Sequence, residues 1–358
     1  MVNSEKSGLP MVDEQSEGRF LVVEVSGPNY TGLKRSALEN DLDFLWRDTG
    51  YATFGLTTSD HINAMAWAAA QSGVLRVWRQ ESEAVLSGRT WRPSDTIIQV
   101  GDAAIGGNGV AVIAGPCSVE DKSQMMEVAA CLRETGASWL RGGAFKPRTS
   151  PYRFQGLGRK GLEYLKLASE EYGLPVVTEV MSIEEIEVVC EHSDVLQVGS
   201  RNAQNFPLLK ALGSSGKPVL LKRGFGCFID ELLHAAEYLM SYGNPQVLVC
   251  ERGIRSHEPS SRFTFDINAI PVLKSATHLP VVADTAHGTG NVDLVGPIAK
   301  AAIAAGADAL MFEIHPHPAL SYSDADQTLS LEQFAALMPE MAAVAGAVGR
   351  RLDGTDRA

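Results

Sequence analysis

Eight short apolar runs recur along residues 109–349, and each is followed by a segment with the amphipathic pattern of a helix. The runs are VAVIAG, SWLRGG, PVVTEV, VLQVGS, PVLLKRG, QVLVCERG, PVVADTAH and ALMFEIHP. Eight strands that alternate with helices predict a closed (β/α)8 TIM barrel, and the span of about 240 residues is close to the ~250 typical of that fold. A doubly wound open sheet is the rival architecture, and the count of eight favours the barrel.

The N-terminal part of the chain follows a different pattern. FLVVEV, YATFGL and VLRVWR read as strands, and residues 34–48 and HINAMAWAAAQSG read as helices, which predicts a small α+β, ferredoxin-like domain, although one strand of its expected hairpin is not apparent. Residues 1–19 are polar, acidic and aperiodic, as is typical of a flexible leader. The predicted parts are a leader at 1–19, a small and candidate regulatory domain at 20–95, a catalytic barrel at 96–350 and a tail at 351–358.

Charge and composition exclude several classes of partner. The formal net charge is -12, so the long-range field repels nucleic acid and anionic membrane surfaces. No apolar run approaches the roughly 20 residues that span a bilayer, and the N-terminus lacks the apolar core of a secretory signal. The five cysteines include no C-x-x-C pair, which favours a reducing compartment. A cytoplasmic protein without nucleic-acid or membrane partners is therefore predicted.

Basic side chains follow four of the predicted strands, at the barrel end where reactive groups gather. They are Arg141, Lys146, Arg148, Arg201, Lys222 and Arg252. A single arginine at such a rim usually pairs with a nearby carboxylate, but six cations at one mouth repel one another unless anions lie between them. Arginine binds phosphate and carboxylate through a planar fork, so the pattern predicts a ligand with more than one anionic group.

Residues that can bind a metal ion follow three strands that become neighbours when the barrel closes. Cys117 follows the first strand, His287 the seventh, and Glu313 and Asp324 the eighth. One sulfur, one imidazole and two carboxylates suit a divalent ion, without selecting strongly among Mn, Fe, Co and Zn. His315 and His317 compete with His287 for the ligand role, and spacing alone does not exclude them.

Several motifs resemble those of one enzyme family. AGPCSVE, LRGGAFKPRTSPYRFQGLG, LQVGSRNAQNF, LLKRGF, CERGIR and EIHPHP followed by SD resemble the 3-deoxy-D-arabino-heptulosonate 7-phosphate (DAHP) synthases of the type I beta branch, over about residues 95–345. The resemblance implies a metal-dependent transferase on a (β/α)8 barrel. Such an enzyme condenses phosphoenolpyruvate with erythrose 4-phosphate, releases inorganic phosphate and opens the shikimate pathway of aromatic amino-acid biosynthesis.

The resemblance also implies roles for individual residues. The implied metal ligands are Cys117, His287, Glu313 and Asp324. The implied phosphoenolpyruvate-binding residues are Arg141, Lys146, Arg201, Lys222 and Arg252. Arg148 and Thr149 of the KPRTS motif are implied to hold the phosphate of the aldehyde substrate; related 3-deoxy-D-manno-octulosonate 8-phosphate synthases carry a KANRSS-like sequence there, which disfavours arabinose 5-phosphate.

The expected chemistry joins C3 of the enolpyruvate to the aldehyde carbon, after which water adds at C2 and phosphate leaves. Lys146, Cys117 and His287 are the catalytic candidates, the last two as metal ligands. Lys146 is the candidate for proton transfer, and we expect neighbouring cations to lower its pKa. The chain reads DTAH where family members often read DPSH, so the groups that orient His287 are expected to differ.

Other readings stay open at this point. One is a related 3-deoxy-ulosonate phosphate synthase that uses a different aldose phosphate, because Gly226, Cys227 and Phe228 after LLKRGF are unusual. Another is a Schiff-base aldolase with Lys146 or Lys222 as the nucleophile, and a third is a metabolite-binding protein without activity. Family relatives imply a homodimer or homotetramer, and the strands before residue 95 favour a domain that senses an aromatic amino acid.

Overall fold

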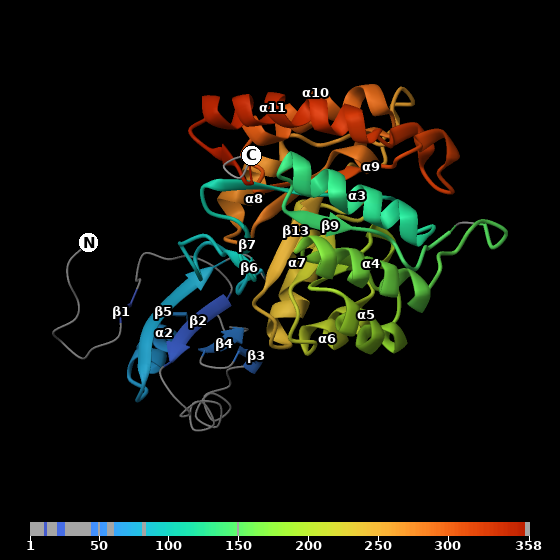
Figure 1. Cartoon of the computed structure of the whole chain (residues 1–358). Coiled ribbons are helices and arrows are strands. Elements are labelled where there is room, and N and C mark those ends of the chain that lie inside the picture. The colour runs from blue at the N-terminus through green and yellow to red at the C-terminus, as the bar shows by residue number, and fades with distance from the viewer. Residues whose placement is uncertain are drawn as a thin grey trace. The chain divides into compact units, whose positions relative to one another are not determined.

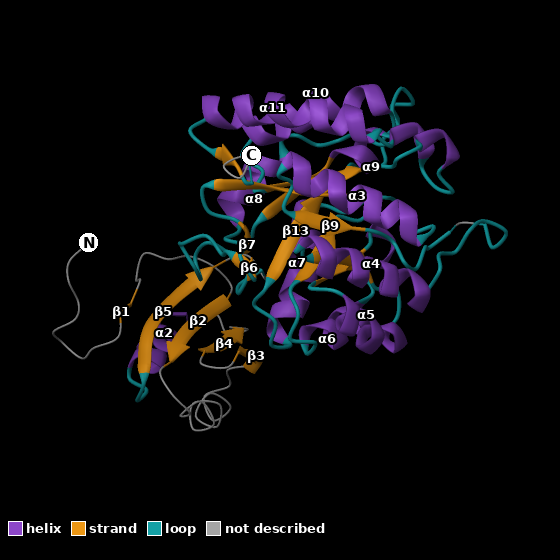
Figure 2. Cartoon of the chain, viewed as in Figure 1, coloured by secondary structure: helices purple, strands orange, loops and turns teal. Residues whose placement is uncertain are grey.

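The computed structural model describes residues 11–12, 20–25, 44–48, 51–55, 61–80, 84–148 and 150–354. The chain divides into two compact units, Met1–Leu86 with Met240–Gly243, and Ser87–Leu239 with Asn244–Ala358. No helix in the described ranges is long and apolar enough to cross a bilayer. Figure 1 labels the elements and Figure 2 separates helices from strands.

The first unit contains a five-stranded sheet and one described helix. Its elements are β1 (Met11–Val12), β2 (Phe20–Val25), β3 (Phe44–Asp48), β4 (Tyr51–Gly55), α2 (His61–Ala69) and β5 (Val74–Gln80). The strand order is β1-β5-β2-β4-β3, and β2 is antiparallel to both β4 and β5. Apart from β1, this is the order of a ferredoxin-like sheet. Leu21, Val23 and Val77 of the sheet pack with Ala64 and Ala68 of α2 in a buried apolar cluster.

Two details of this unit differ from the sequence-based expectation. The predicted helix at 34–48 is wrong over residues 44–48, which form β3, and residues 34–43 lie outside the described part of the chain. β3 is the hairpin strand that was not apparent in the sequence. Met11 and Val12, in the predicted leader, pair in parallel with Arg76 and Val77.

The second unit is a closed barrel of eight parallel strands surrounded by helices (Figure 2). The strands are β8 (Gly109–Gly115), β9 (Trp139–Arg141), β10 (Val176–Glu179), β11 (Val195–Val198), β12 (Val219–Lys222), β13 (Val247–Glu251), β14 (Val281–Asp284) and β15 (Ala309–Glu313). Pairing of β15 with β8, from Ala309↔Ala111 to Glu313↔Gly115, closes the barrel. All eight apolar runs are strands, so the predicted (β/α)8 fold is confirmed.

A helix of at least seven residues follows each barrel strand. These helices are α3 (Lys122–Thr135), α4 (Arg159–Tyr172), α5 (Ile186–His192), α6 (Phe206–Gly213), α7 (Ile229–Ser241), α8 (Ala269–Ala276), α10 (Val292–Ala304) and α11 (Leu331–Ala347). Short helices lie in the loops at the carboxyl ends of the strands. They are the 3-10 helices η1 (Ile183–Glu185), η2 (Ser200–Asn202), η3 (Pro318–Leu320) and η4 (Ala325–Gln327), and the short α-helix α9 (Thr285–Thr289). Asp121 is the N-cap of α3, and its side chain accepts a hydrogen bond from the Gln124 N–H. Gly136, with φ 79°, is the C-cap.

The amino end of the barrel is closed by a hairpin of β6 (Ile98–Val100) and β7 (Ala103–Ile105). Ile98 and Ile105 are buried in the barrel core beside Val195 and Ala309, which begin their own strands. β16 (Arg351–Leu352), in the predicted tail, pairs in parallel with the start of β8. Since the amino end is plugged with apolar side chains, the carboxyl end is the open mouth.

Candidate active site

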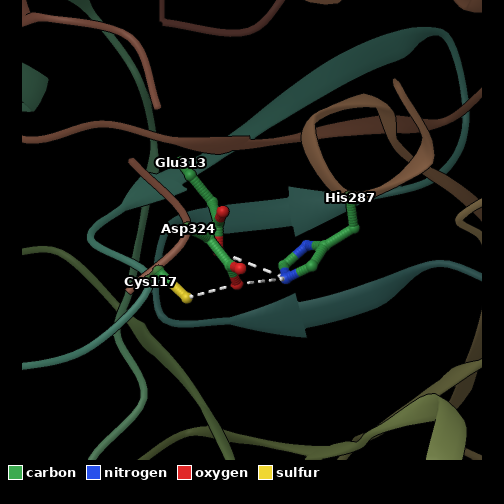
Figure 3. Close-up of side chains that lie close together, drawn as sticks. All are labelled: Cys117, His287, Glu313 and Asp324. Atoms are coloured by element: carbon green, nitrogen blue, oxygen red, sulfur yellow. Dashed lines mark hydrogen bonds and ion pairs between the residues drawn. The ribbon is translucent and has the colours of Figure 1, made fainter. Parts of the chain in front are cut away.

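Four potential metal ligands converge at the carboxyl end of the barrel. One donor atom from each of Cys117, His287, Glu313 and Asp324 lies within 4.8 Å of every other. Figure 3 shows the four side chains pointing toward one another from separate segments. The Cys117 thiol donates to Asp324 Oδ2 at 3.1 Å, and His287 Nε2 lies 3.3 Å from Glu313 Oε1. The sequence therefore pointed to four residues that the fold brings into one cluster.

The ring of His287 is oriented by Asp284, the last residue of β14. Asp284 accepts hydrogen bonds from the His287 backbone N–H at 3.1 Å and from Nδ1 at 2.8 Å, which leaves Nε2 facing the cluster. Burial alone would raise the pKa of Asp284, but His287 and Lys222 outweigh it and hold that pKa well below its usual range. The aspartate of the DTAH sequence is thus an ionised carboxylate that fixes the imidazole tautomer.

The donor set fits a divalent cation. Burial, followed by the charge of Glu313, raises the pKa of the Cys117 thiol to about 12, so without added positive charge the sulfur stays protonated. The carboxyl pKa values of Glu313 and Asp324 are lowered, because His287 and nearby arginines outweigh the effect of burial. Two ionised carboxylates, an imidazole and a thiol that a cation would ionise form a mixed S, N and O ligand set.

The two rival histidines lie outside this cluster. His315 Nε2 is 3.4 Å from Glu120 Oε2, and its Nδ1 accepts from the backbone N–H of His317. Neither histidine belongs to the group of four donors found among the described residues. Of the three histidines that spacing left open, the structure brings only His287 into the four-donor cluster.

A cationic pocket of about 570 Å³ opens beside the cluster. Seven arginines and two lysines line it: Arg141, Lys146, Arg148, Arg153, Arg201, Lys222, Arg252, Arg255 and Arg262. The only acidic side chains among its lining residues in the described chain are Glu179 and Asp324. All six cations predicted from the strand ends lie in this one pocket, whereas Thr149 falls outside the described residues.

Several cations of the pocket are buried and only partly compensated. Arg141 donates to Glu313 Oε1 at 3.2 Å, but its buried Nε has no hydrogen-bond partner within the described chain. Arg252 is also buried, and desolvation lowers its pKa. An unbonded donor and uncompensated guanidinium charge in a buried pocket are costly unless an anionic ligand binds there.

Two stacked rings form one wall of the pocket. Phe225 and Phe263 lie parallel, with centroids 5.2 Å apart. The guanidinium of Arg252 lies 4.0 Å from the Phe263 centroid, and that of Arg201 lies 5.4 Å from Phe225. Phe263 and Arg262 were missed by the sequence analysis, because they lie in a loop without periodicity. Arg255 could have been found, since it lies in the CERGIR motif.

Arg223, the neighbour of Lys222, is not among the residues that line the pocket. It donates to Glu251 at 2.7 Å and to Asp266 at 3.2 Å, so this strand-end arginine forms ion pairs with carboxylates of the protein, and its pair with Glu251 is buried. The pattern of charges at strand ends therefore mixes ligand-facing cations with structural ones, and the sequence does not separate them.

The expectation of a lowered Lys146 pKa is wrong. Desolvation does lower it, but Cys117 and Glu313 more than offset that effect, and the net pKa is raised. Lys146 Nζ donates to the Cys117 carbonyl at 2.7 Å and lies 3.0 Å from Sγ, while Lys222 forms a buried ion pair with Asp284. A Schiff base requires a neutral amine, so these contacts disfavour both lysines as nucleophiles.

A cluster of potential metal ligands beside a cationic pocket, at the mouth of a (β/α)8 barrel, is typical of an enzyme that acts on small, multiply anionic substrates. The model of the DAHP synthetase I family matches residues 93–347, and the chain belongs to this family. The predicted DAHP synthase, a transferase that condenses phosphoenolpyruvate with erythrose 4-phosphate, is confirmed by this match together with the relatives.

Individual relatives agree with the family. A phospho-2-dehydro-3-deoxyheptonate aldolase of Thermotoga maritima is 49% identical over 268 residues, which are 75% of this chain and 79% of that protein. A crystal structure of DAHP synthase from the same organism has a TM-score of 0.77 at 41% identity and covers 94% of this chain and 100% of its own. Its truncated form has a TM-score of 0.71 at 45% identity and covers 75% of this chain and 100% of its own. The likeness to the longer structure thus extends beyond the barrel.

The related octulosonate enzymes are more distant. A 2-dehydro-3-deoxyphosphooctonate aldolase of Syntrophotalea carbinolica is 32% identical over 266 residues, which are 69% of this chain and 95% of that protein. This lower identity agrees with the expectation drawn from the KPRTS motif.

Proposed function

We propose that this DAHP synthase holds a divalent cation on Cys117, His287, Glu313 and Asp324 and binds both substrates in the adjoining cationic pocket. The convergence of four donor atoms within 4.8 Å at the edge of that pocket carries the proposal. When bound, the cation supplies Lewis acidity to the aldehyde oxygen. The donor set does not select its identity, and Mn, Co, Fe and Zn all suit it.

The buried cations provide the phosphoenolpyruvate subsite in this proposal. Arg141, Arg201, Lys222 and Arg252, with Lys146, hold its phosphate and carboxylate groups, and the free Nε of Arg141 supports an anion there. Binding both substrates in one pocket keeps C3 of the enolpyruvate near the aldehyde carbon, which removes much of the entropic barrier to carbon-carbon bond formation.

Lys146 acts as a proton donor in this scheme. Its raised pKa keeps the ammonium protonated, so it can hold or deliver a proton at the aldehyde oxygen as that oxygen gains negative charge. Lys146 is therefore a general acid, and its charge also stabilises the developing alkoxide. Water then adds at C2, and the proton that it loses restores the Lys146 ammonium. The tetrahedral intermediate expels inorganic phosphate as the bond between C2 and the phosphate oxygen breaks.

Arg148 and Thr149 are proposed to hold the phosphate of erythrose 4-phosphate. Arg148 lines the pocket, and its Nε donates to the Phe154 carbonyl at 3.0 Å, which fixes the guanidinium within the loop after β9. Phosphate release should be compared with erythrose 4-phosphate, arabinose 5-phosphate and ribose 5-phosphate in turn. The proposal expects the four-carbon aldehyde to have the highest kcat/KM, and preference for arabinose 5-phosphate would refute this assignment.

Further proposals concern the location, pathway, assembly and regulation of the enzyme. We propose a cytoplasmic enzyme whose product enters the shikimate pathway toward aromatic amino acids. We also propose a homodimer or homotetramer in which the N-terminal unit binds an aromatic amino acid; the ferredoxin-like strand order of that unit supports an effector domain.

A further inference from the structure

Arg262 is linked by hydrogen bonds to the segments that carry three of the four metal-ligand candidates, His287, Glu313 and Asp324. It lies between β13 and α8, and its backbone N–H donates to the carbonyl of Thr289 at the end of α9, the helix that contains His287. Its side chain crosses Gly290 so closely that a Cβ there would lie 2.4 Å from Arg262 Cβ. The guanidinium Nη1 then reaches Asp324 Oδ1 at 3.1 Å.

Gln327 extends this contact to the second carboxylate. The buried Gln327 accepts from Arg262 Nη1 through Oε1 at 2.9 Å and donates through Nε2 to Glu313 Oε2 at 2.5 Å. A guanidinium only donates and a carboxylate only accepts, so this amide orientation is the one that satisfies both neighbours. Arg262 therefore acts on Asp324 directly and on Glu313 through one side chain.

Arg262 and Gln327 together bind one oxygen of Asp324 and one oxygen of Glu313. The other oxygen of each carboxylate faces the remaining metal-ligand candidates. Asp324 Oδ1 faces Arg262, while Oδ2 faces Cys117 Sγ at 3.1 Å and His287 Nε2 at 3.9 Å. Glu313 Oε2 faces Gln327, while Oε1 faces His287 and also accepts from Arg141 Nη1 at 3.2 Å. In both Asp324 and Glu313, one oxygen thus faces the Arg262–Gln327 network and the other faces the metal-ligand candidates.

The backbone of Asp324 also needs such support. Its φ of 52° makes it the one non-glycine residue with positive φ among those that the structure describes. An aspartate in this conformation is strained, and strain of this kind persists where neighbouring contacts hold the residue in place. The hydrogen bond from Arg262 to the Asp324 side chain supplies one such contact.

We propose that Arg262 is a positioning residue, which presents a single oxygen of Asp324 and, through Gln327, a single oxygen of Glu313 to the metal ion. This inference rests on the metal site of the proposed function. Loss of a side chain that orients metal ligands typically lowers metal affinity about 10- to 100-fold. Neither residue needs to touch the ion or the reacting atoms.

Simple electrostatics predicts the opposite effect. A guanidinium near a cation site repels the ion, so removing its charge should strengthen metal binding if charge alone mattered. Positioning predicts that the same substitution weakens binding. Replacing Gln327 changes no charge and so tests the relay without this competing effect.

The experiment titrates Co²⁺ into metal-free, full-length protein by calorimetry and records the ligand-field spectrum of the bound ion. Wild type is compared with Arg262→Gln, Gln327→Leu and the double variant. Each single variant is expected to raise the Co²⁺ dissociation constant about 10- to 100-fold and to change the spectrum. Because both act through one network, the double variant should lose less than the product of the two single effects.

Arg255→Gln is the matched control for Co²⁺ affinity. Arg255 lies in the same loop and lines the same pocket, but its guanidinium lies 5.7 Å from the centroid of the Phe225 ring and makes no hydrogen bond or ion pair with the four ligands in the described part of the chain. Its loss should leave Co²⁺ affinity unchanged or slightly increased. Unchanged or tighter binding by Arg262→Gln, or an unchanged spectrum with Gln327→Leu, would overturn the inference. Failure of the wild type to bind Co²⁺ would instead refute the metal site itself.

Discussion

Asp284 and His287 form a hydrogen-bonded pair, 2.8 Å from carboxylate oxygen to Nδ1, at the end of the seventh barrel strand. The pair fixes which imidazole nitrogen faces Glu313 and Asp324. Because the same carboxylate is ion-paired with Lys222, it joins the four-donor cluster to a cation of the adjoining pocket. On the proposed function, the pairing is expected to affect both metal affinity and substrate binding.

Asp284→Asn should weaken divalent metal binding by about 10- to 100-fold, because an amide neither balances the charge of Lys222 nor fixes the imidazole as firmly. Competition with a chelator of known affinity would measure this. Thr285→Val is the matched control, since this adjacent buried hydroxyl has no hydrogen-bond partner in the described chain. Equal affinities for wild type and Asp284→Asn would show that the pair does not orient the ligand.

Cys117 predicts a pH dependence of metal affinity. With its thiol pKa raised to about 12, the sulfur is protonated near neutral pH, and binding as a thiolate must release that proton. Apparent affinity should therefore rise about tenfold for each unit of increasing pH. Calorimetry in buffers of different ionisation enthalpy would count the released protons.

Cys117→Ala should remove this proton release and the catalytic activity without unfolding the barrel, because it deletes a ligand but leaves the surrounding strands intact. Circular dichroism would check the fold. Full turnover by Cys117→Ala in metal-supplemented buffer would contradict the assigned role of the thiol.

Arg201→Ala should lower the rate by on the order of 10² to 10³ if its charge stabilises the transition state. Arg201 differs from Arg141 and Arg252 in being exposed to solvent at the pocket edge, so its position leaves room for a ligand. Steady-state kinetics with both substrates would separate the effects. A rise in KM with unchanged kcat would indicate uniform binding instead. The exposed Arg159 on α4 is a control, and its replacement by alanine should leave the kinetics unchanged.

The N-terminal unit predicts feedback by an aromatic amino acid. Tyrosine or phenylalanine should lower initial rates of the full-length enzyme, and a variant truncated before Ser87 should lose this response if it folds. Equilibrium binding to the full-length protein provides a readout independent of turnover. If neither tyrosine nor phenylalanine binds the full-length protein or changes its initial rate, this role would be ruled out.

The barrel could be predicted because its signals are local. Each strand is a short buried run rich in valine and leucine, and each carries its polar residues at the same end, so both the fold and the converging side chains follow from the chain itself. β3 was missed for the converse reason. Phe44–Asp48 is a short strand at the sheet edge, and the residues before it had suggested a helix that continued through it.

What the sequence could not supply were contacts between distant loops. The pKa of Lys146 was predicted in the wrong direction because its neighbours in sequence are cations, whereas its contact in space is Cys117. Arg262 and Gln327 are 65 positions apart in loops without periodicity, so nothing local connects them. Which strand-end arginines face the ligand is likewise decided by tertiary packing, as the pairing of Arg223 with Glu251 demonstrates.

The central claim is that one divalent ion binds among Cys117, His287, Glu313 and Asp324. Crystals grown with Mn²⁺ and measured at the manganese absorption edge test it most directly. The account predicts a single strong anomalous peak within bonding distance of the sulfur, the imidazole Nε2 and one oxygen of each carboxylate. A peak elsewhere in the barrel, or none at these four side chains in crystals of catalytically active, Mn²⁺-loaded enzyme, would contradict it.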